Sequence, residues 1–206
     1  IATLRKQLED VAEESRRRIE ELPNGTTRVV TFPDSTLREN ALLKFNLAIT
    51  VDGDRMTIDM RGSSPEFLNR SINTNQGSFK TMMITCFLQN IWPDLPHTMS
   101  VFTYMDFIFD ERSLVNGSFE TPQAMSLIPL FKAMTLPTIP MAKLGYSLPH
   151  RYTAILAPQY DQPATMIYGG LTQNGETVGN FCADINGNGQ GGRAHKDGEH
   201  SVSPPF

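Results

Sequence analysis

The densest group of chemically versatile side chains lies in a glycine-rich segment near the end of the sequence, residues 186–201. His195, Asp197 and His200 fall close together in this segment. Imidazole nitrogens and carboxylate oxygens can bind manganese, iron or zinc, and they can also act as general acids or bases. These three residues are therefore the candidate catalytic residues and the candidate metal ligands. Their spacing fits neither HExxH nor the inverted zinc motif, which favours a polar surface loop over a metal site.

Glycines and basic side chains in and near the same segment could bind an anion. Backbone amides that no side chain covers can face a phosphate or carboxylate group. The alternative, which we favour, is a loop whose backbone needs a positive φ and close approach. The candidate residues for binding a substrate or an anion are Arg193, Lys196, Arg151, Gly189 and Gly191.

The glycine spacing does not indicate a nucleotide-binding fold. Gly187, Gly189 and Gly192 match G-x-G-x-x-G, but a dinucleotide site also requires a helix that begins at the last glycine. The residues that follow show no helical period. No Gly-Lys-Ser/Thr closes the segment, so it is not a P-loop either.

Nucleophilic catalysis has little support in the sequence. No Gly-x-Ser-x-Gly elbow occurs, and neither Cys86 nor Cys182 has a histidine partner visible in the sequence. His97 and His150 each follow a proline in an expected loop, where a structural hydrogen-bonding role is more common than catalysis. Both cysteines lie in apolar surroundings without metal-ligand spacing, which favours a reducing compartment.

The composition excludes several classes of function. With 206 residues, of which 39% are hydrophobic and 19% charged, the chain has an ordinary globular composition. A net charge of -4 gives no electrostatic reason to expect nucleic acid or an anionic membrane as a partner. No apolar run reaches the roughly 18 residues that a membrane span needs. We therefore expect a cytoplasmic protein without nucleic-acid or membrane partners.

A β-hairpin is the element around which the other segments are expected to pack. Hydrophobic residues alternate along 44–51 and again along 55–61, which is typical of two strands with one buried face. Between these runs lies the pair Asp52-Gly53, which tolerates the positive φ of a tight turn. A polar loop follows, and then residues 78–92 have the spacing of a buried helix that ends at a proline.

Residues 1–22 are predicted to form an amphipathic helix. Charged residues cover most of its surface, including a run at 13–18 that we interpret as a solvated helix face. A proline and a glycine follow the helix and end it. Its apolar stripe consists of Ile1, Leu4, Leu8, Val11, Ile19 and Leu22.

The remaining elements follow from hydrophobic period and from helix-breaking residues. Thr121 and Pro122 have the types expected at the start of a helix over 123–134, in which Pro129 predicts a kink or an early end. Residues 136–150 are rich in proline and show no period. A connection with a helical turn is expected over 37–43, and strands are expected over 28–32, 101–109, 151–157, 165–169 and 177–185.

Together these elements predict an α+β fold, in which an antiparallel β-hairpin and a mixed sheet pack with a few helices and long loops. We expect residues 1–206 to be one segment of a larger subunit. Within it, residues 1–22 form the helix, 23–135 contain the hairpin and further helices, and 136–206 form a strand-rich, glycine-rich region.

Two motifs resemble those of a known enzyme family. Asp59-Met-Arg-Gly-Ser-Ser-Pro65 ends the hairpin, and Ser71-Ile-Asn-Thr-Asn75 precedes the predicted buried helix. With Lys196-Asp-Gly198 further downstream, the chain resembles the hydantoinase B family. That family includes the α subunits of acetone and acetophenone carboxylases and the matching half of 5-oxoprolinase.

The resemblance implies an ATP-dependent ketone carboxylase, a ligase that joins bicarbonate and a small ketone into a β-keto acid. It further implies a hydantoinase A-like β subunit that binds most of the ATP, with or without a small γ subunit. The divalent metal, manganese, would be bound outside this segment.

Two alternatives remain open. One is an ATP-dependent amidohydrolase, either N-methylhydantoinase or 5-oxoprolinase. The other is a non-catalytic assembly module that uses the apolar stretch 125–148.

Overall fold

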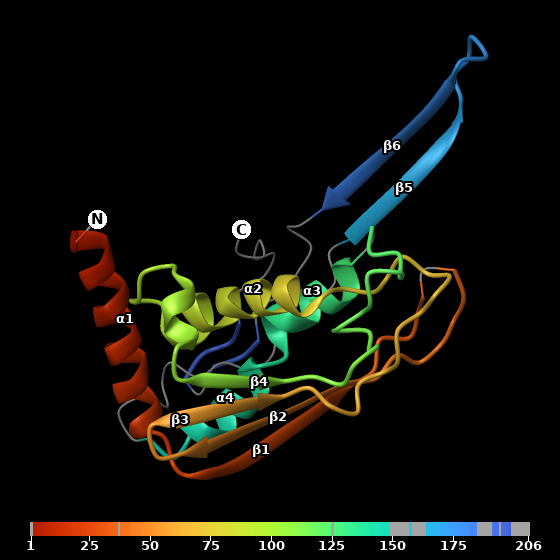
Figure 1. The fold of residues 1–206 in the computed structure, drawn as a ribbon. Helices are drawn as coiled ribbons and strands as arrows, with labels where there is room; N and C mark the ends of the chain where they lie inside the picture. Colours follow the sequence, from red (N-terminus) through yellow and green to blue (C-terminus); the bar gives the residue numbers. More distant parts are fainter. Residues whose placement is uncertain are drawn as a thin grey trace.

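The computed structural model describes residues 2–36, 38–124, 126–148, 157, 164–184, 191–193 and 195–198. These residues form a four-stranded mixed sheet, helices that pack on and beside it, and a two-stranded hairpin (Figure 1). The α+β fold predicted from the sequence is confirmed. No helix among the described residues is both long enough and apolar enough to cross a membrane.

The main sheet has the strand order β1-β2-β3-β4. Its first three strands, β1 (Gly25–Thr31), β2 (Phe45–Asp52) and β3 (Arg55–Asp59), are antiparallel neighbours. The fourth, β4 (Met105–Ile108), pairs in parallel with β3, because the chain crosses over through a helix before it returns to the sheet. The sheet is therefore mixed, as the sequence predicts.

The predicted hairpin is confirmed, and its turn lies one residue further along than the Asp52-Gly53 pair. Asp52 pairs with Arg55, so Gly53 and Asp54 are the two central residues of the turn. Gly53 has a φ of 60°, whereas Asp54 has no positive φ, which is the combination found in a type II′ turn. The inward-facing residues are buried as predicted: Phe45, Leu47, Ile49, Val51, Met56, Ile58 and Met60.

α1 (Ala2–Glu20) leans across one end of the sheet, and its amino end points away from the body of the molecule (Figure 1). Only the second half of its predicted apolar stripe is buried. Val11 and Ile19 lie in the core, whereas Leu4 and Leu8 are 64% and 46% exposed. The hydrophobic period identified the helix correctly, but it also predicted that Leu4 and Leu8 lie on the buried face. They are exposed because this half of the helix extends past the sheet.

α2 (Gln76–Cys86) is the buried helix predicted over 78–92, and a π-helix, Phe87–Ile91, follows it directly. Asn75 caps the amino end, since its side-chain oxygen accepts a hydrogen bond from the Ser78 N–H at 2.8 Å. Its buried residues, the inward faces of β2 and β3, and buried residues of the helices that follow form one hydrophobic core.

α3 (Leu127–Thr135) differs from the helix predicted over 123–134. Its amino-terminal cap is Ser126, so Thr121 is not the cap residue. Pro129 lies in the first turn of α3, where a backbone N–H would have no partner within the helix. The helix therefore continues through Pro129, and the predicted kink or early end does not occur.

α4 (Thr138–Gly145) forms within the stretch 136–150, for which the sequence shows no period. Pro140 is again tolerated because it lies in the first turn.

Residues 125–148 are the apolar stretch that the assembly-module alternative expects to contact another subunit. Most of its described apolar side chains pack inside this chain, namely Phe131, Ala133, Met134, Leu136, Met141 and Leu144.

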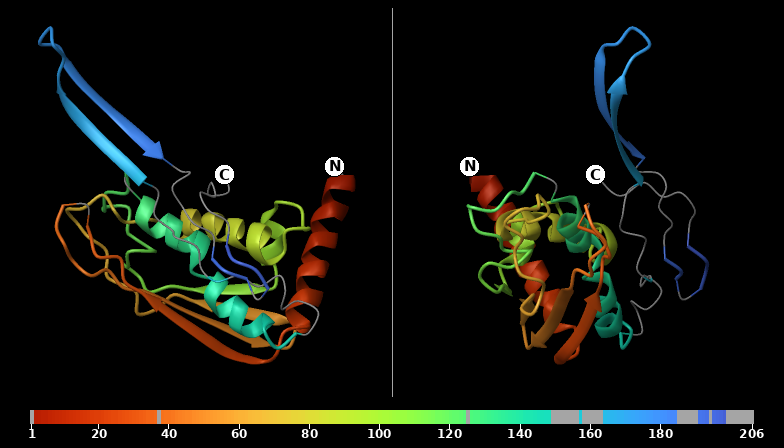
Figure 2. Two further views of the ribbon diagram at one scale, coloured as in Figure 1. Left: turned by 180° about the vertical axis from the view of Figure 1, so that it is seen from behind. Right: turned by 90° about the vertical axis from the view of Figure 1, so that its right-hand side faces the viewer.

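β5 (Ala164–Leu171) and β6 (Thr177–Asp184) form an antiparallel hairpin that confirms the strands expected over 165–169 and 177–185. All views show this hairpin projecting from the rest of the described chain (Figures 1 and 2). The strand expected over 151–157 lies outside the described residues, apart from its last position.

Two further segments differ from expectation. Across the described part of 37–43 there is no helical turn, and Ser35 instead forms a β-bridge with Asn40. The strand expected over 101–109 is shorter, because residues 99–102 form a 3-10 helix before β4 begins. In that helix the Thr98 hydroxyl accepts a hydrogen bond from the Ser100 N–H, which stabilises the turn over an extended chain.

Candidate functional site

The predicted His/Asp cluster is exposed where the structure describes it. His195, Lys196 and Asp197 are exposed, and Arg193 is half-buried. The backbone N–H of Arg193 donates to the Lys196 carbonyl oxygen at 2.9 Å. Of the other predicted site residues, Gly191 is half-buried, and His200, Arg151 and Gly189 lie outside the described residues.

The described residues do not provide a metal site. They contain no group of three or more His, Cys, Asp or Glu side chains that could hold a metal ion. Because His200 is not described, the trio of His195, Asp197 and His200 stays a prediction.

A buried asparagine joins the loops around the amino end of α2. Asn73 is 0% exposed, and its side-chain amide bonds only to backbone groups. Its Oδ1 accepts from the Phe67 N–H at 2.7 Å. Its Nδ2 donates to the carbonyl oxygens of Phe67 at 2.7 Å, Arg70 at 3.0 Å and Pro122 at 3.0 Å. The polar atoms of this buried amide are thus satisfied, and one side chain fixes two loops.

The backbone after Asn73 extends this junction. The Thr74 N–H donates to the Leu114 carbonyl oxygen at 3.0 Å, and the Thr74 carbonyl oxygen accepts from the Gly117 N–H at 2.8 Å. Gly117 is tightly enclosed. A Cβ added there would lie 2.9 Å from Thr121 Oγ1 and 3.2 Å from Asn73 Cβ, so glycine is required by close packing.

The junction forms one wall of a small polar pocket at the amino end of α2. The Asn75 Nδ2 donates to Gln123 Oε1 at 3.2 Å, which links the start of α2 to the segment before α3. None of the described lining residues is charged. The pocket has a volume of about 310 Å³ and is lined by Thr74, Asn75, Ser78, Gln123, Ala124, Ser126 and Leu130.

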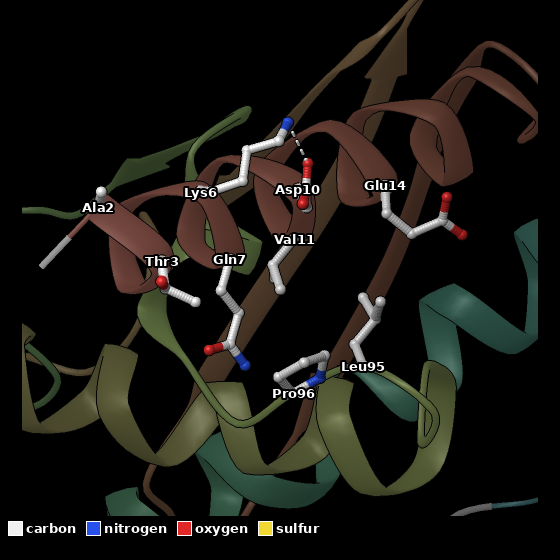
Figure 3. A pocket seen from close by; sticks show the side chains of 9 residues that line it. All are labelled: Ala2, Thr3, Lys6, Gln7, Asp10, Val11, Glu14, Leu95 and Pro96. Atoms are coloured by element: carbon white, nitrogen blue, oxygen red, sulfur yellow. Dashed lines mark ion pairs between the residues drawn. The ribbon is translucent and has the colours of Figure 1, made fainter.

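A second, more open hollow lies beside α1 (Figure 3). On its rim Lys6 forms an ion pair with Asp10 at 2.7 Å, and both side chains are exposed. Glu14 accepts hydrogen bonds from Arg17 and Arg18, and these guanidinium groups lower its pKa to about 2. These ion pairs join side chains of α1 to one another. We therefore interpret the charged residues of this hollow as surface groups of the helix and not as a binding site.

The sequence alone does not reveal the pocket at α2. It marks Ser71–Asn75 as a motif, but only as a sign of family and as the approach to a helix. Gln123 and Ser126 come from a segment that period analysis places inside a helix. A polar run that ends in an asparagine cap before an apolar helix is the signal that could have directed attention there.

The fold and the motifs place the chain in an enzyme family. Residues 2–205 match the model of the Hydantoinase B/oxoprolinase family, so the chain belongs to that family, as the resemblance predicts. A comparison with curated proteins finds no match.

Two solved structures share the fold. Acetone carboxylase in its nucleotide-free form superposes with a TM-score of 0.80 and 18% identity, over 94% of this chain and 27% of that one. ATP-dependent caprolactamase from Pseudomonas jessenii superposes with a TM-score of 0.73 and 14% identity, over 96% of this chain and 33% of that one. The chain thus spans a third or less of the length of these two proteins, and at these identities the similarity establishes the fold alone.

Proposed function

We propose that the chain is part of the catalytic subunit of an ATP-dependent ketone carboxylase of the acetone or acetophenone type. The reaction would join bicarbonate to a small ketone and give a β-keto acid, with ATP supplying the driving force. The observation that carries this proposal is the shared fold with acetone carboxylase over 94% of the chain. Membership of the Hydantoinase B/oxoprolinase family supports the broader class of enzyme.

The pocket at α2 suits one requirement of this chemistry. Bicarbonate, phosphorylated bicarbonate and an enolate all present anionic oxygens, which require hydrogen-bond donors or positive charge around them. Neutral hydrogen-bond donors that are fixed in place by buried backbone contacts can stabilise such oxygens. The rigid junction around Asn73 supports this role, because it fixes the wall of the pocket before any ligand arrives.

The partners and cofactors form part of the same proposal. ATP would be bound mainly by a hydantoinase A-like β subunit, with or without a small γ subunit. Manganese would be bound outside this segment. His195 and Asp197 stay candidate catalytic residues, and Arg193 and Lys196 stay candidates for binding a substrate or an anion.

An amidohydrolase is the second candidate function, and the likeness to caprolactamase favours it. Ring opening of a hydantoin or of 5-oxoproline would also begin at a carbonyl group, so the same pocket could serve either reaction.

The third candidate is an assembly module. The exposed apolar residues of the β5–β6 hairpin support it better than 125–148 does, namely Tyr168, Leu171 and Val178.

Steady-state ATP turnover in the complete complex separates these functions. Acetone, acetophenone, N-methylhydantoin and 5-oxoproline are supplied in turn, with and without bicarbonate. We expect turnover that requires both a ketone and bicarbonate, and turnover with an amide alone would instead support the hydrolase. Alanine variants of His195, Asp197 and His200 that keep full turnover but assemble poorly would favour the assembly module.

A further inference from the structure

Thr74 carries a hydroxyl group that the fold does not use. The residue is 1% exposed and lines the pocket at the amino end of α2, and both of its backbone polar groups are hydrogen-bonded. Its hydroxyl, in contrast, forms no hydrogen bond to any described residue, and it is not sealed from solvent. The hydroxyl therefore opens on the pocket. Most buried hydroxyls have a partner, because an unpaired one costs free energy.

Ser78 offers a second hydroxyl of the same kind. The residue is half-buried and lines the same pocket, and its hydroxyl also has no hydrogen-bond partner among the described residues. The other polar side chains of the pocket are committed to the fold. Ser126 Oγ lies 2.5 Å from the Asn73 carbonyl oxygen, and the Gln123 amide bonds to Asn75 and to the Ser118 carbonyl.

The electrostatics of the pocket favour an anion. α2 has 11 residues, no acidic side chain in its first turn, and the partial positive charge of a helix amino terminus. The N–H groups of Gln76 and Gly77, the first two residues of the helix, also have no hydrogen-bond partner among the described residues. The pocket is thus lined by two hydroxyl groups without a partner among the described residues, and it lies at a helix amino end, where phosphate or carboxylate groups commonly bind.

We infer that this pocket binds an oxyanion, the phosphate or carboxylate group of a small ligand, through the Thr74 and Ser78 hydroxyls and the amino end of α2. The binding itself does not depend on the proposed function. The identification of the ligand does rest on that function: in a ketone carboxylase, the oxyanion is bicarbonate or its phosphorylated form. The site carries no charged lining residue among those described, so its selectivity comes from hydrogen-bond geometry.

Calorimetric titration of the full-length protein with inorganic phosphate, and separately with acetate, tests this inference. The variants are Thr74→Val and Ser78→Ala. Thr81→Val is the matched control, because the Thr81 hydroxyl donates to the Gly77 carbonyl oxygen at 2.9 Å and lies outside the pocket. We expect each pocket variant to raise the Kd about tenfold, the usual effect of losing a hydrogen bond to a charged group. The control should keep the parent Kd.

Thermal unfolding shows whether a loss of binding is a loss of fold. The Thr74→Val variant should unfold at the parent temperature, since its hydroxyl forms no hydrogen bond with the described residues. Equal Kd values for all four proteins, or no binding of either anion, would overturn the inference. Binding that Thr74→Val weakens, in a complex that turns over ATP with no ketone, would uphold the site while refuting the proposed carboxylase.

Discussion

The side-chain amide of Asn73 donates a hydrogen bond to the carbonyl oxygen of Pro122, 3.0 Å away and 49 positions further along the chain. The same amide also bonds to Phe67 and Arg70, which lie just before it. One buried side chain therefore holds together the loop before α2 and the segment before α3. The pocket exists because these two segments meet.

Replacement of Asn73 by alanine should destabilise the protein strongly. The change leaves three part-buried carbonyl groups and one N–H without their partner, and an unsatisfied buried group costs about 1–3 kcal/mol. We expect a loss of about 3 kcal/mol or more in the free energy of unfolding, measured by urea denaturation. Asn46→Ala is the control, because its side-chain amide donates only to the exposed Arg61 carbonyl oxygen, and it should cost about 1 kcal/mol. Equal losses would refute the role assigned to Asn73.

Gly117→Ala should also be destabilising, although the backbone there has no unusual φ. The added methyl group would meet Thr121 Oγ1 at 2.9 Å and the backbone oxygen of Thr74 at 3.4 Å, and overpacking of this kind costs about 1–3 kcal/mol. Gly170→Ala is the matched change, since a Cβ there meets nothing within 4 Å. Thermal unfolding should show a lower Tm for the first variant only. A Gly117 variant as stable as the parent would show that the junction can relax.

The stability of the protein should depend on Glu14 in acid. Arg17 and Arg18 hold the Glu14 pKa at about 2, below its ordinary value of 4.5. Because the folded-state pKa is the lower one, this carboxylate contributes stability above pH 4.5, and the contribution is lost as the pH falls from 4.5 to about 2. Urea unfolding of Glu14→Gln should therefore show a shallower decline over this range than the parent.

The control for this measurement is Glu120→Gln, which removes an exposed carboxylate that forms no ion pair within the described residues. It should decline with pH as the parent does. A Glu14→Gln variant with the slope of the parent protein would contradict the assignment of this effect to the Arg17 and Arg18 contacts.

α1 allows a direct comparison between two positions of one predicted stripe. Ile19 is 0% exposed and Leu4 is 64% exposed. Ile19→Ala should lower the free energy of unfolding by about 2–5 kcal/mol, the usual cost of a cavity in the core. Leu4→Ala should change it by no more than about 0.5 kcal/mol. Chemical denaturation of both variants checks this contrast, and similar losses would place Leu4 in a buried contact.

Local patterns predicted the parts of the fold that local physics determines. The alternation along 44–51 and 55–61 identified the hairpin, and the spacing over 78–92 identified α2. Leu4 and Leu8 show where period fails, since it reports which face of a helix is apolar and not how far the sheet beneath it extends. The prediction of a kink or an early end at Pro129 was wrong for a related reason. The effect of a proline depends on which turn of the helix it occupies, and Pro129 occupies the first turn of α3.

The candidate pocket could not be predicted, because its parts are distant in sequence. Thr74 and Ser78 lie at the start of α2. Gln123 and Ser126 belong to the segment before α3, which hydrogen bonds between Asn73 and that segment hold against the start of α2. The predicted His195 and Asp197 cluster is dense in sequence yet exposed where it is described. The density of reactive residue types can be read directly from a sequence, whereas the meeting of distant loops at a helix terminus cannot.

Fixation of isotopically labelled bicarbonate tests the central claim most directly. The complete complex is incubated with ATP, labelled bicarbonate and either acetone or acetophenone, and label is counted in the β-keto acid product. The carboxylase proposal predicts incorporation that requires both ATP and the ketone. ATP consumption with N-methylhydantoin or 5-oxoproline, without any incorporation of label from bicarbonate, would contradict it.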